Sequence, residues 1–345
     1  MSLFVDIRKQ LGDFLLQVRL ETDSITAILG PSGCGKSMTL KCIAGVETPD
    51  SGKIVLNERT LFDSEKKINV KPQERRVGYL FQNYALFPNM TVRQNILCGL
   101  HREKDKSRKE DVLRKMIRLM GLEGTEDRFP SQISGGQQQR TALARILVSD
   151  PEAILLDEPF SALDTHLREK LMVDMREILI GFGGIAVEVT HNRNEAYYLC
   201  DSTALMDNGE IVAHANSREL FADPGSVIAA KMTGCKNIQA AEYVDDHTVF
   251  VPAWGIRLES EHVRKDVKAV GIRAHSFRDS LEDNRNPIRV LSRFEEPFEE
   301  TLVFRFNSQD GDSPDLWWKT QKGRQPLADR AEIGVLPSDI LLLYS

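Results

Sequence analysis

Residues 30–37 read GPSGCGKS, a spacing of glycine, lysine and serine that suits a phosphate-binding loop. The run follows the apolar segment 25–29 and precedes a segment of helical pattern, so backbone amides and a helix N-terminus would face one anion. Lys36 would neutralise phosphate oxygens, and Ser37 would offer its hydroxyl to magnesium. The expected phosphate-binding residues are Gly30, Pro31, Ser32, Gly33, Cys34, Gly35, Lys36, Ser37 and Met38.

Two adjacent acids, Asp157 and Glu158, follow the apolar run 153–156. Parallel strands end at one edge of their sheet, which would bring both carboxylates beside the phosphate loop. We expect Asp157 to hold magnesium and Glu158 to polarise an attacking water as general base. The alternative is an ordinary strand end with two solvated acids.

A third motif consists of Ser134, Gly135, Gly136 and Gln137, which open a segment with an apolar helical face. Ser134 and Gln137 have the spacing of a capping box. With Ile133 before them, these residues resemble the LSGGQ signature of ATP-binding cassette (ABC) ATPases, and they precede the acidic strand as that family requires. Three single residues resemble further family landmarks, namely the glutamine facing the membrane partner, the D-loop aspartate and the switch histidine: Gln82, Asp164 and His191.

The resemblance to ABC transporter ATP-binding subunits implies ATP and Mg²⁺ as ligands. ATP would lie between two copies of the chain arranged head to tail, with residues 134–137 of one copy completing the phosphate site of the other. The implied catalytic residues are Lys36, Gln82, Glu158 and His191, and the implied magnesium ligands are Ser37, Gln82 and Asp157. Asp164 would also contact the nucleotide site.

Two positions depart from the family pattern. Leu11 stands where an aromatic residue often stacks on adenine, and Phe14 is the nearest aromatic. Asn192 follows His191 where aspartate is frequent. The histidine itself is retained, so the switch position is still expected to function.

Residues 81–92 resemble the ATPases of ABC importers, which often have a C-terminal OB-like domain of the TOBE type. Gly271, Ile272 and Arg273 resemble the GIRP pattern of that domain, with Ala274 in place of proline. Residues 25–30 and 75–79 look most like molybdate or sulfate importer subunits. The resemblance implies import of an oxyanion, with iron, polyamine or sugar as alternative cargo.

Such an importer implies transmembrane permease subunits as partners and, indirectly, an extracytoplasmic solute-binding protein. A different functional class within the same family moves no solute and acts in DNA repair or translation. The single cassette and the lack of sustained heptads or a basic patch argue against that class.

The motifs require an α/β fold to position them. Short apolar runs at 25–29, 153–156 and 185–189 predict buried parallel strands, and residues 38–44 predict a helix that ends at Gly45. Residues 102–120 predict another helix, stopped near Gly121. We therefore predict a P-loop NTPase domain over residues 1–234, with a helical insertion at about 88–150.

Residues 235–345 have a different texture, with seven short strand-like runs separated by turns, which predicts a small all-β, OB-like domain. The boundary is expected near Gly234. Core or interface packing is the expected role of Trp254, Trp317 and Trp318, rather than a ligand cage. The domain could serve dimerisation and stability or ligand-responsive regulation, and the sequence does not choose between them.

The bulk composition limits the partners. The chain has 345 residues, 41% of them hydrophobic, and a net charge of −6, so nucleic acid is not expected as a main partner. No apolar run approaches the length of a membrane span, and the first residues lack a secretory signal. The five cysteines show no metal-ligand or disulfide spacing. We expect a peripheral protein at the cytoplasmic face of the membrane.

Overall fold

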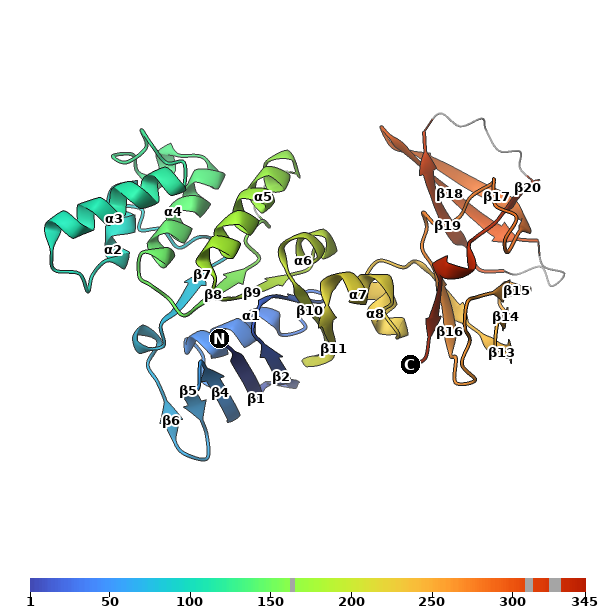
Figure 1. The fold of residues 1–345 in the computed structure, drawn as a ribbon, viewed down its shortest axis with the longest axis horizontal. Helices are drawn as coiled ribbons and strands as arrows, with labels where there is room; N and C mark the ends of the chain where they lie inside the picture. Colours follow the sequence, from blue (N-terminus) through green and yellow to red (C-terminus); the bar gives the residue numbers. More distant parts are fainter. Residues whose placement is uncertain (162–164, 308–312, 323–329) are drawn as a thin grey trace. The chain divides into compact units, whose positions relative to one another are not determined.

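The computed structural model describes residues 1–161, 165–307, 313–322 and 330–345. The chain divides into two compact units, Met1–Arg218 and Glu219–Ser345 (Figure 1). This division precedes Gly234, because helix α8 (Val227–Met232) packs with the second unit. The backbone N–H of Val227 donates to the carbonyl of Ser345 at 2.8 Å.

The first unit contains an eleven-stranded sheet with the order β6-β5-β4-β1-β2-β11-β10-β3-β9-β8-β7. Its strands are β1 (Leu3–Leu11), β2 (Phe14–Thr22), β3 (Ile25–Leu29), β4 (Ser51–Leu56), β5 (Arg59–Asp63), β6 (Ile68–Asn69), β7 (Val77–Leu80), β8 (Ala153–Asp157), β9 (Ile185–Thr190), β10 (Ser202–Asp207) and β11 (Glu210–Asn216). Neighbours from β10 through β3, β9 and β8 to β7 pair in parallel, whereas β6, β5, β4, β1 and β2 pair antiparallel. The predicted parallel sheet is confirmed, and the antiparallel half was not predicted.

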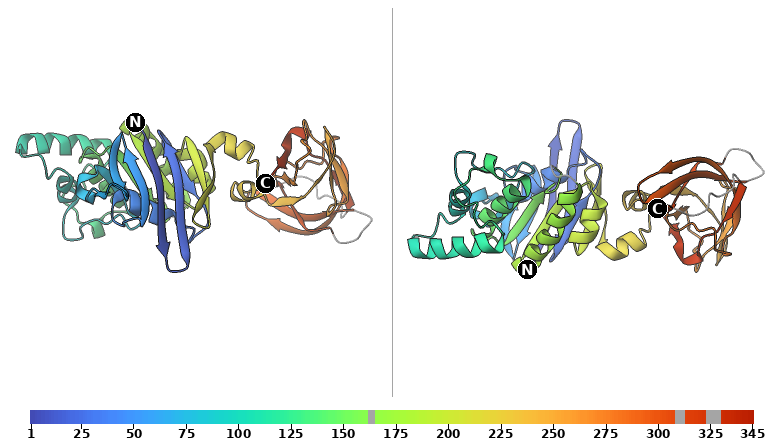
Figure 2. Two further views of the ribbon diagram at one scale, coloured as in Figure 1. Left: turned by 90° about the horizontal axis from the view of Figure 1, so that it is seen from below. Right: turned by 90° about the horizontal axis from the view of Figure 1, so that it is seen from above.

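Helices flank this sheet, and three of them gather beside its β7 end (Figures 1 and 2). The helices are α1 (Lys36–Ala44), α2 (Val92–Gly99), α3 (Lys106–Leu119), α4 (Gly135–Leu147), α5 (Thr165–Phe182) and α6 (Arg193–Leu199), with 3-10 turns η1 (Pro72–Glu74) and η2 (Pro130–Gln132). Helix α7 (Ser217–Ala222) spans the boundary between the two units. The group beside β7 is α2, α3 and α4, which falls within residues 88–150. Helix α3 begins at Lys106, later than expected, because the Asp105 carboxylate caps it by accepting from the amides of Ser107 and Arg108.

The core explains why the central strands read as continuous apolar runs. Every residue of β3, β8 and β9 is buried. Helix α1 packs against β8 and β9, and helix α6 packs against β3 and β9, so helices cover these strands. A charged residue in such a strand is costly to bury, and β9 contains one, Glu188, with 1% of its surface exposed.

The second unit is built from three small antiparallel sheets and helix α8, in accord with the predicted all-β domain. Its sheets have the orders β12-β16-β21, β13-β14-β15 and β19-β18-β17-β20. The strands are β12 (Asn237–Ala240), β13 (Glu242–Asp245), β14 (Thr248–Val251), β15 (Ile256–Glu259), β16 (Ala269–Ile272), β17 (Asn286–Glu295), β18 (Glu299–Phe306), β19 (Leu316–Gln321), β20 (Arg330–Ile333) and β21 (Ile340–Leu343), with the turn η3 (Pro337–Asp339). All seven predicted runs form strands.

Two of the three tryptophans of this unit have the core packing role expected for them. Trp254 and Trp318 are each 1% exposed and belong to its apolar core. Trp317 instead lies half-buried, near-parallel to the Phe294 ring at a centroid distance of 6.4 Å, with the Lys236 ammonium 4.6 Å from its own centroid.

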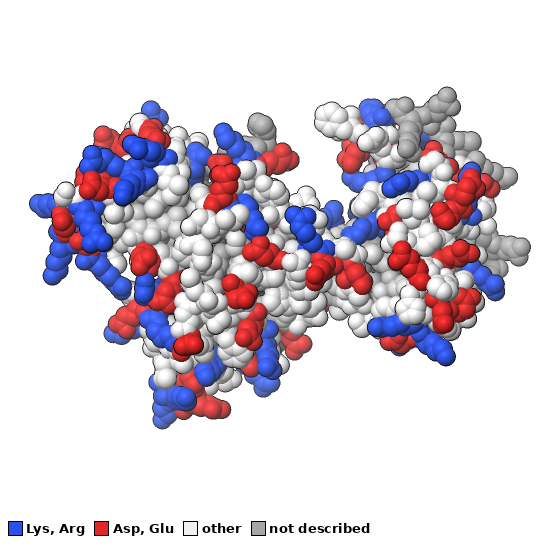
Figure 3. Space-filling view, viewed as in Figure 1, with Lys and Arg blue, Asp and Glu red and all other residues white. Residues whose placement is uncertain are grey.

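Charged side chains of both signs are interspersed over the face seen in Figure 3. Among the described residues, no helix is long and apolar enough to cross a membrane.

Candidate functional site

The phosphate loop joins β3 to α1, as the sequence predicts. Lys36 is 5% exposed, and its ammonium donates to the carbonyls of Gly30 at 2.9 Å and Pro31 at 2.8 Å. Gly33 and Gly35 adopt φ angles of 83° and 105°, which only glycine reaches without strain. The loop is therefore folded into a compact turn around the lysine.

Close packing holds this loop against its surroundings. A Cβ on Gly30 would lie 2.2 Å from the Met206 carbonyl oxygen, so that position admits no side chain. Met38 is half-buried and packs against the main core. Pro31, Ser32 and Gly33 are exposed, which leaves the loop's outer surface open to a ligand.

Cys34 is a buried member of the loop, 4% exposed. Burial raises the pKa of its thiol, and the nearby Lys36 charge only partly offsets this. A raised thiol pKa reduces the thiolate fraction, which is the reactive form. Its role as a small spacer is therefore favoured over that of a reactive thiol.

Asp157 ends β8 directly beside α1. Its Oδ1 accepts from the Ser37 hydroxyl at 2.7 Å, and its Oδ2 accepts from the Tyr79 hydroxyl at 2.7 Å. Burial and this hydrogen bond raise the pKa of Tyr79, so the phenol stays protonated and remains a donor. The pairing of Ser37 and Asp157 places two oxygen ligands at one point, a donor set that suits magnesium.

Glu158 occupies a strained position after β8, with a φ angle of 45°, and its N–H donates to the Val189 carbonyl at 3.0 Å. Its Oε1 lies 3.2 Å from Nδ1 of His191, the first residue after β9. Strands β8 and β9 are neighbours in the sheet, which explains why residues 33 positions apart meet.

Gln82 lies next to this pair through Ser161. The Gln82 amide donates to the Ser161 hydroxyl at 3.2 Å, and that hydroxyl donates to the Glu158 carbonyl at 2.9 Å. The structure thus brings Ser37, Asp157, Glu158, Gln82 and His191 to one edge of the sheet. Asp164 lies outside the described residues.

The signature residues form the N-terminus of α4, and their predicted capping box is present. The Gln137 amide donates to the Ser134 hydroxyl at 3.3 Å, and the Ser134 amide donates to the Gln137 side-chain oxygen at 3.0 Å. Ser134 is exposed, Gly135 is half-buried and Gly136 is buried. Over the described part of the chain, no hydrogen bond or ion pair joins residues 134–137 to the phosphate loop.

Sequence reasoning missed three contributors. The sequence assigned no role to Tyr79, and the parallel pairing of β7 with β8 brings its hydroxyl to Asp157. Gln139 donates from its buried side chain to the Pro159 carbonyl at 3.2 Å, which ties α4 to the acidic strand. Glu195 accepts hydrogen bonds from Thr190 and Asn192, the two neighbours of His191. These three residues belong to no motif of fixed spacing, so the sequence did not indicate their roles.

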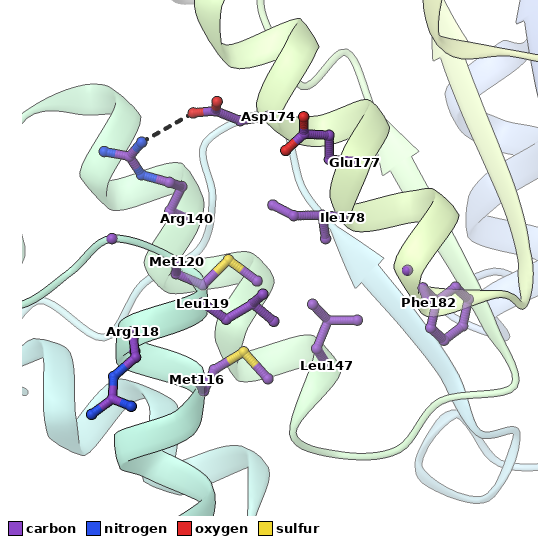
Figure 4. A pocket seen from close by; sticks show the side chains of 12 residues that line it. Met116, Arg118, Leu119, Met120, Arg140, Leu147, Asp174, Glu177, Ile178 and Phe182 are labelled. Carbon is purple, nitrogen blue, oxygen red and sulfur yellow. Dashed lines mark hydrogen bonds and ion pairs between the residues drawn. The ribbon is translucent and has the colours of Figure 1, made fainter.

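A separate pocket of about 600 Å³ lies between α3, α4 and α5 (Figure 4). Its apolar lining comes from Met116, Leu119, Met120, Leu147, Ile178 and Phe182. At its rim, Arg140 of α4 pairs with Asp174 of α5 at 3.2 Å. None of the predicted site residues lines it.

Comparison with known proteins identifies the family. The family model described as "ABC transporter" matches residues 15–161. The chain is 38% identical over 274 residues to the Fe(3+) ions import ATP-binding protein FbpC of Haemophilus influenzae, covering 79% of this chain and 77% of that protein. The chain belongs to the ATP-binding subunits of ABC transporters.

Other relatives of this ABC ATPase include a probable sulfate/thiosulfate import ATP-binding protein, CysA, of Chlorella vulgaris. It is 40% identical over 242 residues, covering 68% of this chain and all of that protein. The spermidine/putrescine import ATP-binding protein PotA of Oleidesulfovibrio alaskensis is 39% identical over 226 residues, covering 65% of this chain and 58% of that protein.

A solved dimeric structure of the ATP-binding cassette MJ0796, in a post-hydrolysis state bound to ADP and phosphate, is similar in fold. It superposes with a TM-score of 0.53 at 27% identity, covering 63% of this chain and 99% of that one. The predicted ABC ATPase fold is confirmed.

Proposed function

We propose that this chain hydrolyses ATP to power import of a solute by an ABC transporter. The observation that carries the proposal is the cluster at one sheet edge, where Ser37 pairs with Asp157 and Glu158 with His191 beside the phosphate loop. Relatives whose names include import ATP-binding activity span most of the chain.

ATP binding would use the phosphate loop. Lys36 gives its hydrogen bonds to two loop carbonyls, and it would transfer them to phosphate oxygens when a nucleotide enters. Ser37 and Asp157, with Gln82, would hold magnesium, which would neutralise charge on the phosphates. The all-oxygen donor set at Ser37 and Asp157 fits that ion.

Hydrolysis would depend on Glu158 and His191. Glu158, 20% exposed at its side chain, is accessible to water and would accept hydrogen bonds from the attacking water as general base. His191 contacts the same carboxylate and has a side chain 55% exposed, so it would hold the base and face the terminal phosphate.

A second copy of the chain would complete the site. Ser134 is exposed, and its hydroxyl stands with glycine amides at the N-terminus of α4, a set of donors that suits a phosphate. Because these donors do not contact the chain's own phosphate loop, a head-to-tail dimer would bring them to the nucleotide of the partner copy. The similar cassette is dimeric, which supports this proposal.

The permease would contact the surface near Gln82. Phe87 is 47% exposed there, with the Arg145 guanidinium 5.3 Å from its ring centroid. An exposed aromatic residue beside a cation suits a protein interface. The chain would then lie at the cytoplasmic face of the membrane, with a solute-binding protein acting indirectly on the far side.

The proposed cargo is an oxyanion such as sulfate or molybdate. The sulfate/thiosulfate relative supports it. Ferric iron is the second candidate, since the iron relative matches a larger share of the chain. Uptake of labelled sulfate, molybdate and iron by cells with and without the gene would separate them.

The test of the catalytic assignment replaces Glu158 with glutamine in the full-length chain. Hydrolysis should fall by at least about 100-fold while ATP binding persists, because the phosphate donors remain and only the base is lost. Glu152→Gln, before the opposite end of β8, is the matched control and should hydrolyse normally. Rapid phosphate release by the Glu158→Gln chain would refute the assignment.

A further inference from the structure

His191 is an exposed side chain on a very short connection. Strand β9 ends at Thr190 and α6 begins at Arg193, so His191 and Asn192 alone join them. The His191 ring can therefore hold one position beside Glu158 only if the backbone on each side of it is fixed.

Glu195, in the first turn of α6, contacts both neighbours of His191. It is 4% exposed. Its Oε2 accepts from the Thr190 hydroxyl at 2.5 Å, and its Oε1 accepts from the Asn192 side-chain amide at 3.0 Å. The Thr190 hydroxyl also accepts from the Asn192 backbone amide at 2.9 Å, which closes a ring of hydrogen bonds around the histidine.

We infer that Glu195 is a positioning residue for ATP hydrolysis, which acts by holding the turn that carries His191. This inference rests on the proposed role of His191. Glu195 makes no hydrogen bond with His191 or with Glu158, so it is not a catalytic residue.

The chemistry of the ring favours a carboxylate at this position. Burial raises the pKa of Glu195, and the hydrogen bonds from Thr190 and Asn192 and the charge of Arg168 offset only part of that rise. The three groups that contact the carboxylate, from Thr190, Asn192 and Arg168, are donors, and an amide in its place would turn one donor toward another. Glutamine would therefore keep the shape and lose one of the two contacts.

The same carboxylate reaches a second element. Nε of Arg168, in α5, lies 3.9 Å from Oε1 of Glu195. Helix α5 begins three residues before Arg168, directly after the segment that contains Asp164. This partly exposed ion pair links α5 to the carboxylate that holds the His191 turn, so a displacement of α5 would also displace that carboxylate.

The test measures ATPase kinetics and melting temperature of full-length Glu195→Gln. We expect kcat to fall about tenfold, because a small misplacement of a catalytic group is costly, while KM for ATP is unchanged. Glu188→Gln is the control for the loss of a buried carboxylate, since Glu188 of β9 makes its side-chain hydrogen bond with Cys200 and none with Thr190, His191 or Asn192. The control should keep wild-type kcat.

A second variant keeps the outcome decisive. Thr190→Val removes the other end of the shortest bond, and it should reproduce the loss of kcat. The double variant should be no slower than either single one, because residues that act through one contact are not additive. Full additivity, or a normal kcat in Glu195→Gln, would overturn the inference.

The variant His191→Ala distinguishes a failure of the role inferred for Glu195 from a failure of the role proposed for His191. If His191→Ala is slow and Glu195→Gln is normal, only the role of Glu195 is wrong. If His191→Ala turns over at the wild-type rate, the role of His191 fails and the inference fails with it. A fall in melting temperature that parallels the loss of kcat in every variant would indicate structural damage and would also overturn it.

Discussion

Glu158 and His191 approach within 3.2 Å, yet each is positioned by a different piece of backbone. Glu158 has a positive φ angle and follows β8, and His191 follows β9. The distance between the two side chains therefore depends on the register of the adjacent parallel strands β8 and β9. Any residue that shifts this register or the turn after β9 should change catalysis without touching ATP.

Glu188 is a charge-bearing residue in the middle of that region. Its pKa is raised to about 8 by burial and, to a smaller extent, by the Glu195 charge. The Cys200 thiol donates to its Oε2 at 3.4 Å, whereas Oε1 has no hydrogen-bond partner among the described residues. At neutral pH the folded protein therefore favours the protonated acid.

This burial predicts a specific dependence of stability on pH. The folded pKa lies above the ordinary value of 4.5, so the stabilising effect of Glu188 is complete below pH 4.5 and is lost as the pH rises toward about 8. Glu188→Gln should remove this loss. Its free energy of unfolding relative to wild type should rise by about 1.4 kcal/mol per pH unit up to about pH 8 and then level off.

Denaturant unfolding of both proteins between pH 5.5 and pH 8.5, roughly the window in which a carboxyl of raised pKa changes charge, would measure this difference. The subtraction cancels the other titrating groups. A constant difference across that range would mean that Glu188 is ionised in the folded protein.

At the scale of elements, α1 is anchored at both ends. Its N-terminus carries the phosphate loop, and its C-terminal carbonyls meet Arg75, which is fully buried. The Arg75 guanidinium donates to the carbonyls of Cys42 at 2.8 Å, Ile43 at 2.7 Å and Val70 at 2.8 Å. A cation at a helix C-terminus also interacts favourably with the negative end of the helix dipole.

Arg75→Met should therefore destabilise the first unit by about 3 kcal/mol, because several buried carbonyls would lose their donor. Burial lowers the pKa of Arg75 to about 10, so the group stays charged at neutral pH. Chemical denaturation would measure the change. The neighbouring Arg76→Met is the control and should cost less than about 1 kcal/mol, since its side chain is 40% exposed and its two ion pairs lie at the surface. Equal effects of the two changes would contradict the anchoring role.

The sequence predicted those elements that a short stretch of neighbouring residues is enough to identify. Buried parallel strands such as β3 and β8 read as apolar runs, and the capping box at Ser134 has a fixed spacing. Strands β1 and β2 were not predicted, although their inward residues alternate with exposed ones. Tyr79 and Glu195 escaped because their contacts depend on strand neighbours and a turn, which no spacing along the chain encodes.

Helix α5 connects several parts of the first unit. It pairs with α4 through Arg140 and Asp174 and with α6 through Arg168 and Glu195. Its Arg176 also pairs at 2.7 Å with Asp201, the residue before β10. The pocket of Figure 4 lies along the same helix. Helix α5 is thus linked both to α4, which begins with the signature residues, and to Glu195, which holds the turn of His191.

At the scale of the whole molecule, the proposed unit of function is a dimer with two composite sites. Each site would combine Lys36 and Glu158 of one copy with Ser134 of the other. A chain with Lys36→Ala and a chain with Ser134→Arg should each be inactive alone, because each homodimer has two broken sites. In the mixed dimer, one site contains both changes and the other contains neither.

Mixing the two inactive chains in equal amounts should therefore restore phosphate release. Random pairing gives about half mixed dimers with one intact site of two, so about a quarter of wild-type activity is expected. Mixing Lys36→Ala with Glu158→Gln is the matched control, since both changes lie on the same side of the composite site and neither mixed site is intact. Recovery in the control, or none in the first mixture with both chains folded, would show that each copy completes its own site.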